Sequence, residues 1–408
     1  MIKTSYYQDL TKMNTFGMKV KARCFMEYDS VADLVDIEFE ELARPVLHIG
    51  GGSNLLFTDD FKGTVLHSKI NFIEILDKCQ CIPEAPSHSV GPSPEPAAAG
   101  FSLQRSTGPF AESLERVGKC LLHTNGTSSD DVDSTDAGTK DASDSVMVSV
   151  GAGVVFDDFC EWAAKEGLWG VENLSHIPGE VGASAVQNIG AYGVEVKDVI
   201  RKVYCYDTQE EEFVHFDVEE CGYGYRDSIF KDPEIKGRYI VTHVVFALSR
   251  EPMPKLDYGH LKDAVDAAGS DLTPALIRKV IIRIRKEKLP EPSAVGSAGS
   301  FFKNPVISAE HFARIEAAAK AEHGADYNVP HYDLPDDMIK VPAAWMIEQC
   351  GWKGRRSGGA AVWEKQPLVI VNYTGEAYPE EITGLEKRII ASVKAKFGVD
   401  LHPEVEHI

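Results

Sequence analysis

The order of apolar and polar residues predicts short strands through much of the chain. Apolar runs of strand length, often rich in β-branched and aromatic residues, end at glycine or polar residues. These runs are residues 45–50, 63–68, 146–151, 199–207, 211–217 and 238–248. We interpret each of them as a β-strand.

Three other segments repeat apolar residues at the spacing of an amphipathic helix. They cover residues 156–167, 273–290 and 380–397, with Pro274 in the first turn of the second and Gly398 just after the third. Their apolar stripes are Phe156, Phe159 and Ala163; Ile277, Val280, Ile281 and Ile284; and Ile382, Leu385, Ile389 and Val393. Strands dominate the first half and helices are commoner in the second, which favours an α+β fold with separable domains.

One long segment, residues 78–145, lacks this periodicity. Pro, Ser, Gly, Ala and Asp dominate it, and such a composition cannot bury enough apolar surface to offset the entropy of ordering. We predict a low-complexity acidic insert that is largely disordered. It is either a tolerated loop insertion or an acidic interaction arm.

Composition narrows the class of protein. The 408 residues exceed the size of one hydrophobic core, so two or three domains are expected. The formal net charge of −21 argues against general binding to nucleic acid or to anionic membranes, but leaves room for an anionic small ligand. No apolar stretch reaches membrane-spanning length, and the N-terminus lacks a signal-peptide core. The eight cysteines form no CxxC pair, so we expect a reduced, cytoplasmic, metal-free protein.

Two glycine-rich segments are candidate ligand sites. Residues 48–57 read HIGGGSNLLF, where three glycines let the backbone approach a ligand and form an anion-binding nest. The segment is neither a GxGxxG fingerprint nor a Walker loop. Residues 177–195 combine four glycines with serine, glutamine and asparagine. That mixture suits a pyrophosphate and a polar heterocycle, with a packed structural loop as the alternative.

Three further segments carry candidate polar side chains. Arg226, in GYGYRDSIFK, offers a bidentate fork for a carboxylate or phosphate, or else forms a surface ion pair. Ser300, in GSAGSFFKNP, lies in a small-residue turn and has no GxSxG elbow around it, which argues against a hydrolase nucleophile. Glu404 in the terminal LHPEVEHI has no evident role by itself.

Together these segments resemble the family of UDP-N-acetylenolpyruvoylglucosamine reductases. The most specific motifs are PGEVGASAVQNIGAYG at 178–193, YRDSIFK at 225–231 and GSFFKNP at 299–305. YRDSIFK and LDYGHL at 256–261 resemble the type I subgroup. The resemblance covers nearly the whole chain apart from the insert.

The resemblance implies an FAD-binding domain of the vanillyl-alcohol-oxidase (PCMH) type in two subdomains, followed by an α/β substrate-binding domain. The expected boundaries are 1–77 and 146–255 for the two subdomains and 256–375 for the domain that binds the UDP-sugar. The insert takes 78–145. Residues 376–408 are expected to form a helix and a returning strand that brings Glu404 to the site.

The resemblance also assigns residues. It implies that non-covalent FAD is cradled by Gly50, Gly51, Gly52, Ser53, Asn54, Pro178, Gly179, Gly182, Ala183, Ser184, Gln187, Asn188, Gly190, Ala191, Tyr192 and Gly193. The implied substrate-binding residues are Tyr225, Tyr258, Lys288, Asn304 and Gln349, and the implied catalytic residues are Arg226, Ser300 and Glu404.

The implied reaction begins when NADPH gives a hydride to FAD. UDP-N-acetylglucosamine enolpyruvate then receives the hydride and becomes UDP-N-acetylmuramate, a peptidoglycan precursor. Arg226 and Glu404 would stabilise charge that develops on the enolpyruvyl carboxylate, with the pKa of Glu404 raised by burial. Ser300 would donate the proton. We expect a monomer with small-molecule partners only.

Two other hypotheses stay open from sequence alone. A sister flavoenzyme of the same fold could pass its electrons to oxygen, although GSFFKNP and YRDSIFK speak against the substrate domain of an oxidase. A silent binding protein could keep FAD or a UDP-sugar as a structural ligand. Loss of Arg226, Ser300 or Glu404 would indicate that protein, and all three residues are present.

Overall fold

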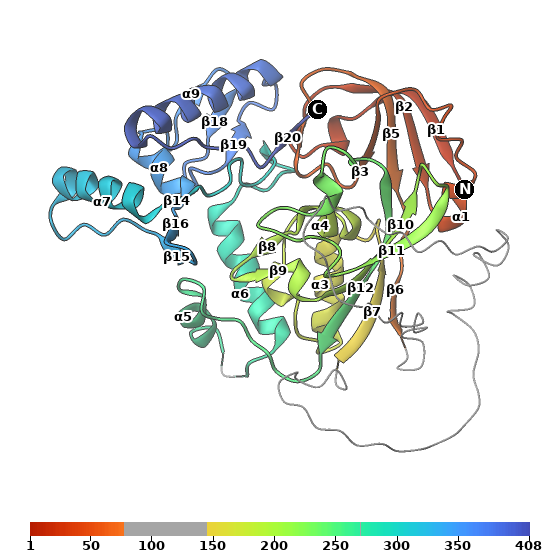
Figure 1. Ribbon diagram of the computed structural model, residues 1–408, viewed down its shortest axis with the longest axis horizontal. Helices are drawn as coiled ribbons and strands as arrows, with labels where there is room; N and C mark the ends of the chain where they lie inside the picture. Colours follow the sequence, from red (N-terminus) through yellow and green to blue (C-terminus); the bar gives the residue numbers. More distant parts are fainter. Residues whose placement is uncertain (77–144, 270) are drawn as a thin grey trace, which may run out of the picture.

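The computed structural model describes residues 1–76, 145–269 and 271–408, and the predicted insert lies outside it apart from Ser145 (Figure 1). The first subdomain is a four-stranded sheet in the order β1-β2-β5-β3. Its strands are β1 (Lys3–Asp9), β2 (Lys21–Tyr28), β3 (Val46–Ile49) and β5 (Phe61–Ser68). Strand β5 runs parallel to both β2 and β3, so the ends of β3 and β5 meet at one edge of the sheet.

The second subdomain is an antiparallel sheet in the order β11-β10-β12-β7-β6, so its first strand, β6, comes from the range 1–77 that was expected to form the first subdomain. Its strands are β6 (Ile73–Leu76), β7 (Ser145–Gly151), β10 (Ile200–Asp207), β11 (Glu212–Asp217) and β12 (Tyr239–Ser249). Helices α3 (Phe156–Lys165) and α4 (Val181–Gln187) and the hairpin of β8 (Gly190–Ala191) and β9 (Val194–Glu195) complete the subdomain. The strands and the helix predicted in this region are confirmed.

The C-terminal part contains two small sheets and most of the helices. One sheet has the order β13-β19-β18-β17 and the other β14-β16-β15. The strands are β13 (Gly296–Ser297), β14 (Val306–Ser308), β15 (Tyr332–Leu334), β16 (Met338–Lys340), β17 (Arg356–Ser357), β18 (Ala360–Val362) and β19 (Ile370–Asn372). The helices are α5 (Leu261–Asp266), α6 (Pro274–Lys288), α7 (Ala309–His323), α8 (Ala343–Gln349) and α9 (Pro379–Phe397).

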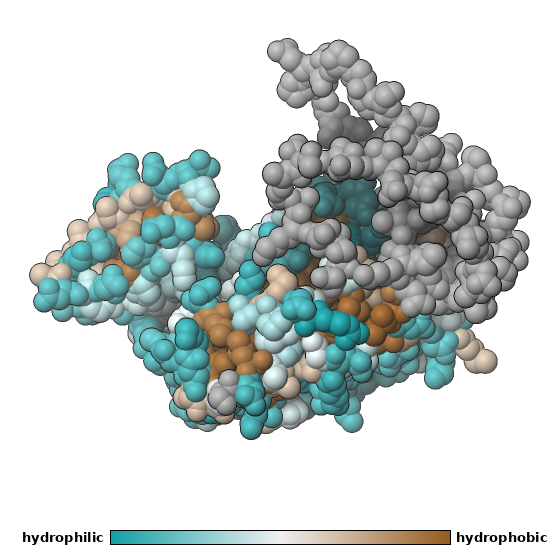
Figure 2. All heavy atoms as spheres, turned by 90° about the horizontal axis from the view of Figure 1, so that it is seen from below, coloured by the Kyte–Doolittle hydropathy of each residue, from teal (hydrophilic) through white to brown (hydrophobic). Residues whose placement is uncertain are grey.

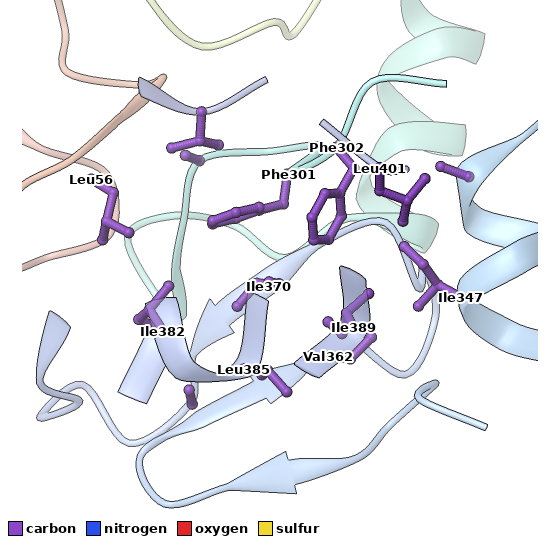
Figure 3. Packing of buried hydrophobic residues seen from close by; sticks show 14 of the residues in the cluster. Leu56, Phe301, Phe302, Ile347, Val362, Ile370, Ile382, Leu385, Ile389 and Leu401 are labelled. Carbon is purple, nitrogen blue, oxygen red and sulfur yellow. The ribbon is translucent and has the colours of Figure 1, made fainter. Parts of the chain in front are cut away.

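The predicted helices α6 and α9 form because their caps and apolar stripes agree. Thr273 accepts a hydrogen bond from the backbone N–H of Leu276 at the start of α6. Helix α9 ends at Gly398, whose left-handed φ of 70° suits glycine. The predicted stripe of α9 is fully buried and packs on Leu56, Phe301 and other apolar residues (Figure 3).

One hydrophobic core joins the first subdomain to the C-terminal part. It contains Phe16 and Leu56 from the first subdomain together with Phe301, Ile370 and Leu385. The last strand, β20 (Glu406–His407), returns to pair in parallel with β4 (Leu55–Leu56). The C-terminus is thus paired with the end of the first glycine-rich segment, which contains β4.

The remaining short elements are helix α1 (Val31–Val35) and single 3-10 turns at Thr11–Met13, Glu172–Leu174, Val196–Asp198 and Ile229–Lys231. Figure 2 shows hydrophilic side chains over much of one face, with apolar residues gathered in separate areas. Among the helices of the described residues, none has the length and apolarity needed to cross a membrane.

Candidate active site

A cavity of about 740 Å³ lies where the two glycine-rich segments, the YRDSIFK segment and the C-terminus meet. That volume is within the range of small-molecule and cofactor sites. Twelve of the predicted cofactor residues line it: Gly50, Gly51, Gly52, Ser53, Asn54, Pro178, Gly179, Gly182, Ala183, Ser184, Gln187 and Gly190. The three predicted catalytic residues, Arg226, Ser300 and Glu404, line the same cavity.

The first glycine-rich segment forms one wall because its backbone follows a path that side chains would block. Gly52 has a φ of 61°, and a Cβ at this position would collide with the carbonyl oxygen of Met13. Asn54 donates from Nδ2 to the backbone oxygen of Glu404 at 3.0 Å. The wall is therefore bonded to the returning C-terminus.

The second glycine-rich segment forms the opposite wall, and it contains helix α4 rather than an extended loop. Gly182 allows close packing, since a Cβ there would lie 2.9 Å from the Cβ of Ala152. Ser53 donates to the carbonyl oxygen of Pro178 at 3.0 Å, so the two walls are in direct contact. Peptide groups and small side chains line both walls, as a long cofactor with a pyrophosphate requires.

Four predicted cofactor residues do not line the cavity: Asn188, Ala191, Tyr192 and Gly193. Asn188 is fully buried, and its Nδ2 donates to the carbonyl oxygen of Gly224 at 2.8 Å. Its carboxamide therefore shapes the wall rather than facing a ring edge. The other three residues form the β8–β9 hairpin beside the cavity.

Arg226 is held at the cavity by three different partners. Its Nε donates to Oε1 of Glu404 at 2.9 Å, and its two terminal nitrogens donate to the carbonyl oxygens of Asn188 and Gly190 at 3.4 and 2.6 Å. Its backbone φ of 56° is left-handed, which is uncommon for arginine and typical of strained functional positions. A guanidinium has five N–H groups, so two remain for a ligand.

Glu404 is buried beside this guanidinium, with 16% of its side chain exposed. Burial raises the pKa of its carboxyl group, and the neighbouring Arg226 opposes that shift without cancelling it. Its backbone N–H donates to the carbonyl oxygen of Phe301 at 2.8 Å. This contact aligns Glu404 with the segment that carries Ser300.

Ser300 lies on that segment between Gly299, whose φ is 68°, and the buried Phe301. The isolated bridge between Phe302 and Pro403 holds the segment against the C-terminus. Three segments that are far apart in the sequence thus bring Arg226, Ser300 and Glu404 to one cavity.

None of the five predicted substrate residues lines this cavity, although three of them lie on segments that adjoin it. Asn304 donates from Nδ2 to the hydroxyl of Tyr225 at 3.5 Å, and its Oδ1 accepts from the N–H of Ala343 at 2.9 Å. Tyr258 packs edge-to-face on Tyr192, with 5.9 Å between the ring centroids. Tyr225 and Tyr258 keep 37% and 45% of their surface exposed, so both rings are accessible to a ligand.

The other two predicted substrate residues lie elsewhere. Lys288 is exposed at the end of α6, where its carbonyl oxygen accepts from the indole N–H of Trp363. Gln349 lines a separate pocket of about 170 Å³ and contacts His323 and Tyr327. The structure does not bring these two side chains to the large cavity.

Several charged residues of this region were not predicted from the sequence to belong to the site. Arg285 lines the cavity from α6. It lies four residues after Ile281 and therefore on the apolar face of the helix, and an arginine on that face is a sequence signal for a buried functional role. Lys231 donates to Oε1 of Gln187 and to the carbonyl oxygen of Arg226. Lys340 lies over the rings of Tyr225 and Tyr332, at 5.1 and 5.4 Å from the centroids.

These residues fit a dinucleotide cofactor such as FAD. The glycine cradle accepts a pyrophosphate, and Arg226 and Arg285 supply positive charge within a strongly acidic protein. Within the described part of the chain, no group of three or more His, Cys, Asp or Glu side chains is arranged to hold a metal ion.

Comparisons with known proteins agree with this geometry. Residues 291–408 match the family described as UDP-N-acetylenolpyruvoylglucosamine reductase, C-terminal domain, and residues 132–216 match an FAD binding domain. A UDP-N-acetylenolpyruvoylglucosamine reductase of Bacteroides fragilis is 43% identical over 400 residues, which is 98% of each chain. One from Porphyromonas gingivalis is 38% identical over 404 residues, covering 98% of this chain and 97% of the relative.

A solved structure supports the fold. The crystal structure of UDP-N-acetylenolpyruvylglucosamine reductase from Thermus caldophilus superimposes with a TM-score of 0.56 and 20% sequence identity. The match covers 100% of this chain and 98% of that one. It bears out the expected α+β fold.

Proposed function

The chain belongs to the family of UDP-N-acetylenolpyruvoylglucosamine reductases, and from that membership we propose how its cavity performs the reaction. The protein is an FAD-containing oxidoreductase that reduces UDP-N-acetylglucosamine enolpyruvate to UDP-N-acetylmuramate for peptidoglycan synthesis. The observation that carries the proposal is the meeting of Arg226, Ser300 and Glu404 at the glycine-lined cavity.

We propose that the two glycine-rich walls hold FAD without a covalent bond and that NADPH is the hydride donor. When bound, FAD supplies hydride transfer from NADPH to the terminal alkene carbon of the enolpyruvyl group. The backbone of Gly50–Asn54 and the α4 segment would bind the pyrophosphate, and Arg285 would contribute positive charge at the same cavity.

Arg226 would bind the enolpyruvyl carboxylate with its two remaining N–H groups. Negative charge builds on that carboxylate as the hydride arrives, so a fork already oriented by three hydrogen bonds stabilises the transition state more than the ground state. Glu404 would orient the fork. Its raised pKa also favours a neutral carboxyl group that does not repel the substrate's carboxylate.

Ser300 would donate a proton to the carbon next to the reduced one. A serine hydroxyl is a weak acid, but the enol-like centre created by hydride addition is basic enough to take its proton. The Ser300 segment is bonded to the Glu404 segment, so donor and carboxylate binders keep a fixed relation.

We propose that Tyr225, Asn304 and Tyr258 make the main contacts to the UDP-sugar. The two tyrosines are partly exposed, Asn304 is bonded to Tyr225, and Lys340 adds a cation beside Tyr225. Lys288 and Gln349 remain predictions from the resemblance, because their side chains lie away from the cavity.

We further propose a monomeric cytoplasmic enzyme. The five cysteines of the described residues are free thiols, as is usual in a reducing compartment.

Ser300→Ala tests the proposal. We expect reduction of the flavin by NADPH to stay within threefold of the wild-type rate. Reoxidation of the reduced flavin by UDP-N-acetylglucosamine enolpyruvate should slow by about 10²–10⁴-fold, the usual contribution of a positioned acid. Anaerobic stopped-flow absorbance measures both half-reactions. Equal losses in the two would remove Ser300 from the role of proton donor.

A further inference from the structure

A buried ion cluster joins the two FAD subdomains beneath the wall of the cavity. His67 on β5 is 2% exposed and lies directly opposite Glu27 on the neighbouring strand β2. Its Nδ1 is 3.1 Å from Oε1 of Glu27, and its Nε2 is 3.1 Å from Oε1 of Glu180. Glu180 precedes α4 in the second subdomain, so the imidazole bridges the two halves of the cofactor-binding region.

Both ring nitrogens of His67 face carboxylate oxygens, and a neutral histidine has only one N–H to donate. An imidazolium donates to both. Lys69 lies 3.7 Å from Glu27, so two cations then balance the two carboxylates of the cluster.

A second histidine nearby, the half-buried His48, lines the cavity and stays neutral. Burial and the charge on His67 lower the pKa of His48 to about 4. Its Nε2 lies 2.6 Å from the hydroxyl of Tyr28, whose pKa is raised by burial. Both groups are therefore uncharged at neutral pH.

Glu180 links this cluster to the cofactor site. It lines the large cavity, and its Oε2 lies 3.2 Å from the position that a Cβ on Gly50 would take. A bare carboxylate at this distance from the glycine cradle would repel a bound pyrophosphate. His67 does not line the cavity, so it acts on the cavity only through Glu180.

We propose that His67 is a cationic positioning residue of the cofactor site, which holds Glu180 against the first glycine-rich segment and neutralises it towards the anionic cofactor. The inference rests on the proposed FAD site. The proposal explains why Glu180 is tolerated between two segments that are proposed to bind phosphate. It also places an ionic contact between the two subdomains.

The test compares His67→Gln, Glu180→Gln and the double variant, each reconstituted with FAD at pH 8. Flavin fluorescence gives the dissociation constant. His67→Gln leaves the carboxylate of Glu180 uncompensated and should weaken FAD binding by about tenfold or more. The double variant should bind FAD more tightly than His67→Gln and about as tightly as Glu180→Gln, because the uncompensated charge of Glu180 is gone. His215→Gln, on β11 away from the cluster, is the matched control and should change nothing.

A double variant as weak as His67→Gln would overturn the proposal, since the loss would then come from packing. The protonation state has its own readout: ¹⁵N NMR of histidine-labelled protein should show both ring nitrogens of His67 protonated at pH 8. A single protonated nitrogen would also overturn it. If wild-type protein takes up no FAD, the proposed function fails, whereas the NMR result still decides the charge of His67.

Discussion

Two arginine–carboxylate pairs in this protein have similar surroundings and opposite designs. Arg226 pairs with Glu404 and Arg238 with Asp207; the arginine side chains are 17% and 18% exposed, and each lies over the ring of a neighbouring tyrosine, at 5.2 and 5.1 Å. Arg238 directs three contacts of 2.6–2.9 Å at the carboxylate of Asp207. Arg226 gives one N–H to Glu404 and two to backbone oxygens.

The difference shows which pair is built for a ligand. Asp207 is fully buried and also accepts from the backbone N–H groups of Gln209 and Glu210, so that pair is closed on itself. The Arg226 pair lines the cavity and sits on a left-handed backbone. Burial does not separate the two pairs, whereas their position does, because Arg238 and Asp207 do not line the cavity.

The largest expected effect is on catalysis. Arg226→Lys keeps the charge but removes the fork, so reoxidation of the flavin by the enolpyruvate should slow by about 10²–10³-fold. Reduction by NADPH should stay within threefold. Arg238→Lys, the matched control, should leave both rates within threefold in the same stopped-flow experiment. The comparison would fail if both lysine variants lost the same activity.

The second effect is a loss of stability, which we expect for the Arg238–Asp207 pair. Asp207→Asn leaves the guanidinium of Arg238 without its counter-charge and should lower the free energy of unfolding by about 3 kcal/mol. Urea denaturation monitored by circular dichroism measures this loss. Glu404→Gln should not show it at pH 8. An equal loss in the two variants would mean that the pairs are structurally equivalent.

The smallest effect is a pH dependence. The pKa of Glu404 is raised above 4.5 by burial, so the folded state binds more protons than the unfolded state between 4.5 and that higher value. The favourable contribution of the protonated carboxyl is complete below pH 4.5 and is lost as the pH rises through the raised pKa. Glu404→Gln keeps a neutral group, and its melting temperature relative to wild type should therefore increase from pH 4.5 to pH 8.

Glu381 provides the control of opposite sign. The backbone N–H groups of Gly359 and Tyr378 lower the pKa of its carboxyl group. The stability that it contributes is present above pH 4.5 and is lost as the pH falls through the lowered pKa. Glu381→Gln should be less stable than wild type at pH 8, and the difference should fade on acidification. Parallel curves for the two variants would contradict the assignment of Glu404.

The parts of the fold that sequence could predict are those in which local signals agree. Helix α9 has its buried stripe and its glycine stop, and α6 has its Thr273 cap. Helix α4 was missed because its stripe is made of glycine, alanine and serine, residues that also suit a loop. Strand β1 was missed because its residues are largely exposed and give no alternation.

The residues of the site likewise include some that the sequence could predict and some that it could not. The glycine-rich segments and Arg226 were candidates from their residue types, Ser300 and Glu404 gained their roles from the family resemblance, and the fold brings all of them to one cavity. The cluster of Glu27, His67 and Glu180 depends on a cross-strand pair and on a contact between residues 113 positions apart, which no local pattern signals. Gln349 shows the limit in the other direction, because the family resemblance implied a substrate role for it and its side chain lies in a separate pocket.

The central claim is that one cavity serves both a flavin and the enolpyruvyl substrate. An anaerobic absorbance experiment tests it most directly: the bound flavin is reduced with one equivalent of NADPH, and UDP-N-acetylglucosamine enolpyruvate is then added. We predict bleaching of the flavin followed by rapid return of the oxidised spectrum. A flavin that is reduced by NADPH but stays reduced after the enolpyruvate is added would contradict the account.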